Sequence, residues 1–162
     1  MILMDLNEQV DWDFSRALRK ARLRRLVLRL RGKSAAYGTS PSFEEVQGTL
    51  RAYNRVRRGI RLVDLQKIVG SVGRSRDFDN SFMPLRAAAG ERWKRVDLAF
   101  YRDQALAPVS LYKVGDEYFV EDGNHRISVA RYHGLPDVEA DVTELWPVHA
   151  ESRNAGPETM AA

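Results

Sequence analysis

A strand-to-helix junction in the C-terminal third of the chain constrains the fold most. Residues 117–120 read Glu-Tyr-Phe-Val and predict a strand, and the apolar spacing over residues 124–133 predicts a helix. Gly123 separates the two elements, and Gly134 follows the second one. Since glycine accepts the backbone conformations that tight turns and helix ends require, we expect a strand, a sharp turn and a short helix.

The junction has the chemistry of an anion site. The first turn of a helix presents backbone N–H groups without intrahelical acceptors at the positive end of the helix dipole. Arg126 adds a planar fork of donors suited to phosphate oxygens, and His125 stands beside it. We therefore predict that Gly123, Asn124, His125 and Arg126 bind the phosphates of a nucleotide. The alternative is that Gly123 only forms the turn and that Asp122 or Asn124 only caps the helix.

Asp122 stands next to these predicted phosphate ligands. Its carboxylate could hold Mg²⁺ or act as a general base, as phosphoryl transfer requires. The expected cofactor is a nucleotide such as ATP or CTP, with Mg²⁺ if the site is catalytic. A helix-capping aspartate is the competing interpretation.

Positive charge is concentrated in one segment. Residues 16–33 hold nine basic residues and no acid, which leaves −5 for the rest of a chain whose net charge is +4. We expect a helix over residues 12–31, with an apolar face (Leu23, Leu26, Val27 and Leu30) that packs on the domain and a basic face (Arg22, Arg25 and Arg29). These three arginines, together with Arg74 and Arg76 in a glycine loop, are candidate contacts to DNA or RNA phosphates. The alternative is that they are simply solvated.

The remaining pattern predicts an α+β fold. Ser42 and Glu45 form a capping box that opens a second helix, which we expect to end at Gly59. A strand and a short helix are expected in 60–69, a helix in 91–104, a hairpin strand in 109–114 and a last strand in 138–142. The expected core is Leu62, Leu65, Ile68, Val109, Leu111, Phe119, Ile127, Val129, Val138 and Val142.

Composition narrows the function classes. The chain has no cysteine, so disulfides and cysteine nucleophiles are excluded, and its three histidines are too dispersed to suggest a zinc set. His133, at the end of a predicted helix, is expected to complement the helix dipole. No apolar run approaches the roughly 20 residues that span a bilayer, so we expect a cytoplasmic protein without a membrane partner.

Residues 62–145 resemble the ParB/sulfiredoxin superfamily. The resemblance rests on the hairpin, the motif Asp122-Gly123-Asn124-His125-Arg126, the short helix, Gly134 and a strand, with Pro108-Val109-Ser110-Leu111 before them and residues 74–79 as the superfamily's arginine segment. It implies a small mixed sheet with packed helices, here preceded by N-terminal helices. It also implies phosphate contacts by Gly123, His125 and Arg126. We expect a helical extension in 1–60, the ParB/sulfiredoxin-like domain in 61–146 and a disordered tail in 147–162.

Departures from the superfamily pattern limit the activity. Sulfiredoxins carry a catalytic cysteine where this chain has Asn124, so sulfinic-acid reduction is excluded. The Asn-x-x-Arg motif and the helix-turn-helix domain of ParB clamps are not seen. Two functions remain open: a ParB-like nucleotide-binding module of a DNA-associated or regulatory protein, or a small Mg²⁺-dependent phosphotransferase, nucleotide hydrolase or nuclease. Fold alone does not choose between them.

Overall fold

A computed structural model describes residues 5–32, 53–72 and 77–147. It contains an N-terminal helix α1 (Leu6–Leu30), a five-stranded sheet and two further α-helices, α3 (Gly90–Tyr101) and α4 (Asn124–Tyr132). The strands are β1 (Tyr53–Asp64), β2 (Ile68–Ser71), β3 (Val109–Val114), β4 (Glu117–Asp122) and β5 (Asp137–Pro147). Short 3-10 turns, η2 (Leu65–Lys67) and η3 (Ala87–Ala89), precede β2 and α3. The predicted α+β fold is confirmed.

The sheet is mixed, with the order β1-β5-β3-β4-β2. β3 and β4 form the expected antiparallel hairpin around Gly115 and Asp116, while β5 runs parallel to β3 on its other side. β2 adds a short parallel edge strand beside β4, and β1 pairs antiparallel with β5 along its whole length. This order places the end of β4 and the start of α4 beside the start of β3, where the predicted phosphate site lies.

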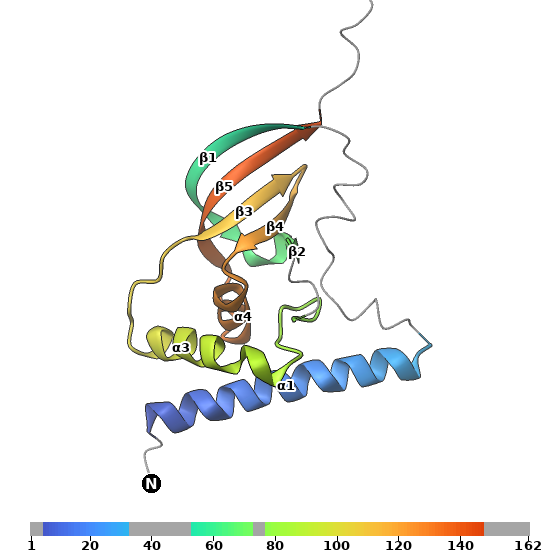
Figure 1. Cartoon of the computed structure of the whole chain (residues 1–162), viewed down its shortest axis with the longest axis vertical. Coiled ribbons are helices and arrows are strands. Elements are labelled where there is room, and N and C mark those ends of the chain that lie inside the picture. The colour runs from blue at the N-terminus through green and yellow to red at the C-terminus, as the bar shows by residue number, and fades with distance from the viewer. Residues whose placement is uncertain (1–4, 33–52, 73–76, 148–162) are drawn as a thin grey trace, which may run out of the picture.

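Helices cover one face of the sheet in two layers. Figure 1 shows α4 directly against the sheet, with α3 and α1 beyond it. Ile127 and Ala130 of α4 pack with sheet residues such as Val109, Leu111 and Val142 in the main core. Fully burying a side chain of the size of Ile127 or Leu111 contributes about 1.5–3 kcal/mol, so this interface fixes the position of α4.

The second layer is an interface of three helices. Trp93 of α3 is fully buried between Phe14 of α1 and Val129 of α4. Its indole N–H donates a hydrogen bond of 2.8 Å to the Ser128 hydroxyl. Ala17 of α1 is also fully buried, and such a small side chain lets α1 lie close to α3.

The expectation for the apolar face of the basic helix was wrong. Leu23, Leu26 and Leu30 are 62%, 52% and 78% exposed, and the face of α1 that packs on the domain is Val10, Asp13, Phe14, Ala17 and Ala21. The contact therefore runs from Val10 to Ala21, the stretch of α1 that meets α3 (Figure 1). Leu23, Leu26 and Leu30, which follow this stretch along α1, remain exposed.

Two further expectations differ from the structure. Residues 53–59 are strand rather than the end of a second helix, because they pair with β5, and Gly59 has φ +71° where the register shifts. Two predicted core residues are not fully buried. Leu62 is 68% exposed, since its neighbour Val63 takes the inward position of β1. Val138 is only partly buried against the core. The remaining predicted core residues are buried. Residues 42–52 and the tail 148–162 lie outside the described residues.

None of the helices in the described ranges has both the length and the apolar character needed to cross a bilayer. The cytoplasmic location stays a prediction.

Candidate functional site

Only glycine fits the turn between β4 and α4. Gly123 has φ +110°, in the region that L side chains rarely adopt. A Cβ atom at this position would lie 2.6 Å from Cγ1 of Val109. The close approach of Gly123 to the start of β3 therefore fixes the direction in which α4 begins.

The N-terminus of α4 opens into a pocket. Within the described residues no side chain caps this helix, and its first turn carries no acid. As in any α-helix, the first backbone N–H groups have no acceptors within the helix, and they lie at the positive end of the helix dipole. The pocket has a volume of about 440 Å³ and is lined by Arg92, Arg95, Val96, Glu121, Asp122, Gly123, Asn124, His125 and Arg126. This volume is within the range of small-molecule sites.

All five residues predicted from the junction line this pocket, but Arg126 also has a structural role. Its Nη1 donates to the carbonyl oxygens of Ala107 and Pro108, the latter at 2.8 Å. Its Nη2 pairs with the Asp122 carboxylate at 2.7 Å. The guanidinium thus ties the segment before β3 to the end of β4, and only part of its donor capacity remains for other partners.

The two acids of the pocket are engaged differently. Asp122 pairs with Arg126, but its side chain is 77% exposed, so an oxygen remains accessible to a metal ion or a proton. Glu121 accepts a hydrogen bond of 2.6 Å from the Tyr112 hydroxyl. The roles suggested for Asp122 from the sequence stay predictions.

Asn124 and His125 are held in place by burial and ring packing. Asn124 is 5% exposed, and its Oδ1 has no hydrogen-bond partner among the described residues. The His125 ring packs edge-on against Phe78, with centroids 5.3 Å apart. The Asn124 oxygen is thus a buried acceptor without a donor, in a side chain that lines the pocket.

Arg92 and Arg95 are the pocket residues that the sequence reasoning missed. Both belong to α3, three residues apart, so they project from the same side of that helix. Their spacing is visible in the sequence. That they face the α4 N-terminus depends on the packing of α3 against α4, which no local pattern reveals.

The predicted nucleic-acid contacts do not join this pocket. Arg22 and Arg29 are exposed on the second half of α1, and Arg25 is partly buried. None of the three lines the α4 pocket. Arg74 and Arg76 lie outside the described residues. Contact of these arginines with DNA or RNA stays a prediction.

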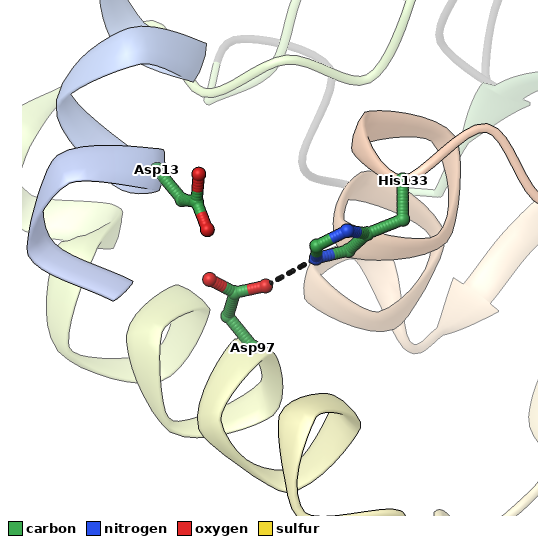
Figure 2. Close-up of side chains that lie close together, drawn as sticks. All are labelled: Asp13, Asp97 and His133. Carbon is green, nitrogen blue, oxygen red and sulfur yellow. Dashed lines mark hydrogen bonds and ion pairs between the residues drawn. The ribbon is translucent and has the colours of Figure 1, made fainter. Parts of the chain in front are cut away.

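A second group of polar side chains lies between the helices. Figure 2 shows Asp13 of α1, Asp97 of α3 and His133 at the end of α4 converging on one point. His133 Nε2 and Asp97 Oδ1 are 2.6 Å apart. Asp13 accepts hydrogen bonds of 2.6 Å from the hydroxyls of Tyr101 and Tyr132. His133 thus contacts a buried carboxylate, an arrangement that the dipole interpretation from the sequence did not include.

The environments of the two carboxylates push their pKa values apart. Burial raises the pKa of Asp97 above its ordinary value, although the contact with His133 opposes this. Burial also acts to raise the pKa of Asp13, but the hydroxyls of Tyr101 and Tyr132 and the Gln9 amide outweigh it and lower that pKa. Asp13 is therefore the carboxylate held in the charged form, and Asp97 is the one that burial penalises.

A sequence signal for this group exists. Asp13 shares its helix face with Val10, Phe14 and Ala17, and Asp97 stands one turn after Trp93 on the buried face of α3. A carboxylate within the apolar face of a helix needs a partner. That both carboxylates lie beside His133 follows only from the tertiary structure.

Comparisons with known proteins give a structural likeness. The sequence matches no protein-family model and no curated protein. The structure is similar to the crystal structure of sulfiredoxin from Arabidopsis thaliana, with a TM-score of 0.38 and 20% identity, covering 51% of this chain and 82% of that chain. At this level the likeness assigns neither a family nor an activity, so the ParB/sulfiredoxin resemblance of the motif stays a prediction.

Proposed function

We propose that the pocket at the N-terminus of α4 binds the phosphate groups of a nucleotide. One observation carries the proposal: Arg92 and Arg95 of α3 line the same cavity of about 440 Å³ as the uncapped first turn of α4. Backbone N–H groups and arginine side chains that face one cavity make a phosphate site, because both favour negative charge and both donate hydrogen bonds to oxygen.

The rest of the pocket favours a nucleotide over free phosphate. Asn124 lines the pocket, and its buried Oδ1, which has no hydrogen-bond partner among the described residues, would accept a donor if ligand binding opened it. Nucleotides supply such donors from sugar hydroxyls and base amino groups, and the pocket volume exceeds what one phosphate fills. ATP and CTP are the nucleotides that the motif resemblance suggests.

The binding module of a regulatory or DNA-associated protein is the leading form of this proposal. The second form is a Mg²⁺-dependent transferase, hydrolase or nuclease, and the exposed Asp122 carboxylate at the pocket favours it. In that form Asp122 would hold the metal ion or accept the proton of the attacking group. If the wild type turns over a bound nucleotide, and Asp122→Asn abolishes turnover but keeps the affinity for that nucleotide, the protein is the enzyme.

Calorimetric titration with ATP and CTP, with and without Mg²⁺, tests the proposal. The informative variants are Arg92→Gln and Arg95→Gln, and Arg102→Gln is the matched control because Arg102 is exposed next to α3 but does not line the pocket. Loss of one charge-assisted contact, worth about 1.5–3 kcal/mol, weakens affinity by about 10- to 100-fold. The site is refuted if the wild type binds neither nucleotide, or if Arg102→Gln weakens binding as much as Arg92→Gln and Arg95→Gln do.

A further inference from the structure

We propose that Asp13, Asp97 and His133 form a binding site for a divalent transition-metal ion. The site is separate from the α4 N-terminal pocket. The three side chains come from α1, α3 and the end of α4, and one potential ligand atom from each lies within 4.8 Å of the other two (Figure 2). Two carboxylates and an imidazole are a ligand set that transition metals use.

An unsatisfied oxygen points into this group. Asp97 is fully buried, and its Oδ2 has no hydrogen-bond partner among the described residues. Figure 2 shows this oxygen facing the carboxylate of Asp13, while the other oxygen of Asp97 faces His133. Two carboxylates that face each other in a buried place need a proton or a cation between them, since like charges cannot both stay ionised there without one.

The surroundings of Asp13 are those of an oriented metal ligand. An ionised carboxylate offers about four acceptor positions. Tyr101 and Gln9 occupy two of them on Oδ2, and Tyr132 occupies one on Oδ1. One position remains for a cation. Hydrogen bonds from neighbouring groups commonly orient metal-bound carboxylates in this way.

The imidazole is also fixed in place. Phe100 stacks on His133 with ring centroids 4.1 Å apart and an interplanar angle of 19°. The ring can therefore turn little, and its Nε2 stays directed at Asp97. A neutral imidazole nitrogen held in this position favours zinc, cobalt or a similar ion over Mg²⁺ or Ca²⁺, which prefer oxygen ligands only.

A pocket borders the group on the side of Asp13 and His133. A cavity of about 690 Å³ is lined by Asp13 and His133 but not by Asp97, and its other lining residues include Tyr101, Tyr132 and the basic Arg16, Arg19 and Lys20 of α1. The cavity borders two of the three ligands and leaves space for water or a small ligand beside them. Three protein ligands with an open position are typical of a reactive rather than a purely structural metal site.

Metal titration of the chelator-dialysed full chain tests the site. Co²⁺ should bind with a stoichiometry of one and give visible absorption bands, and Zn²⁺ should displace it. His133→Gln and Asp97→Asn should each weaken Co²⁺ affinity at least tenfold. His125→Gln and Asp116→Asn are the matched controls, because His125 lies in the other pocket and Asp116 is exposed in the β3–β4 turn.

Circular dichroism of each variant separates ligand loss from unfolding. If Asp97→Asn does not fold, His133→Gln carries the test, since His133 lies at the end of α4. Wild-type protein that binds no Co²⁺, or binding that His133→Gln leaves unchanged, would overturn the proposal. Controls that lose as much Co²⁺ affinity as the ligand variants would overturn it as well. Nucleotide binding at the α4 pocket is independent of each of these outcomes.

Discussion

The Arg126 guanidinium pairs with the Asp122 carboxylate at 2.7 Å across the junction of β4 and α4. The two residues flank the turn glycine, and the same guanidinium donates to the carbonyl oxygen of Pro108 at 2.8 Å. Asp122, the turn and the segment before β3 are therefore held together by one side chain. This relationship makes Arg126 part of the framework of the candidate site as well as part of its lining.

We expect Arg126→Ala to lower the free energy of unfolding by about 1–3 kcal/mol, because two carbonyl oxygens and a carboxylate lose a charged donor. Denaturant unfolding followed by circular dichroism measures this. Arg92→Ala, at an exposed position of the same pocket, should change stability by less than about 0.5 kcal/mol. Equal stability losses in the two variants would show that Arg126 has no special framework role.

Gly123→Ala should be more damaging. The new Cβ would meet Val109 Cγ1 at 2.6 Å in a backbone conformation of φ +110°, so strain and overpacking add. We expect a loss of roughly 2–5 kcal/mol in the free energy of unfolding. The double variant Gly123→Ala/Val109→Ala should lose less than the sum of the single variants, because removing the valine methyls relieves the clash. Strict additivity would contradict the contact.

The alkaline titration of Tyr101 reports on the buried carboxylate beside it. Burial and the hydrogen bond to Asp13 raise the pKa of Tyr101 to about 12. Because the folded pKa lies above the ordinary value of about 10, stability from this group is fully present below about pH 10 and is lost as pH rises toward about 12. The difference in phenolate absorbance between wild type and Tyr101→Phe gives this pKa.

In Asp13→Asn the pKa of Tyr101 should fall toward its ordinary value but stay above it, since burial remains. Asp116→Asn, at an exposed turn, should leave the titration as in the wild type. A Tyr101 pKa that is the same in Asp13→Asn and wild type would show that the hydrogen bond contributes nothing.

The basic face of α1 gives a prediction about nucleic acid. If Arg22, Arg25 and Arg29 contact phosphates, duplex DNA should bind at low salt and dissociate as salt rises, because bound counterions are released. Changing all three to Gln keeps helix propensity nearly intact and should flatten the slope of log affinity against log salt by up to about 3. Arg102→Gln should leave the slope unchanged. If the wild-type protein binds no duplex DNA at low salt, the predicted contact is refuted.

The local sequence pattern was enough to predict the elements around the β4–α4 junction. The glycine pair Gly115 and Gly123 and the alternation between them predict the β3–β4 hairpin and the start of α4, because turn chemistry and side-chain period act over a few residues. The residues of the phosphate motif likewise gather at one pocket because they are consecutive.

Long-range packing explains what the sequence could not predict. Residues 53–59 read as a helix end but are strand, since pairing with β5 satisfies their backbone groups. The apolar stripe of α1 predicted contact at Leu23 and Leu26, but the α1 residues that pack with Trp93 of α3 are Phe14, Ala17 and Ala21. The positions of Arg92 and His133 could not be predicted for the same reason. Each residue meets the other members of its site only when separate helices pack together.

An NMR titration of ¹⁵N-labelled protein with ATP and CTP tests the central claim most directly, because it reads the backbone N–H groups of the first turn of α4 individually. If phosphate binds there, the amide signals of Asn124, His125 and Arg126 should shift most on nucleotide addition, and the shifts should be much smaller in Arg92→Gln/Arg95→Gln. If nucleotide at millimolar concentration leaves these three amides unchanged, or if the largest shifts lie on α1, the pocket at the α4 N-terminus is not a nucleotide site.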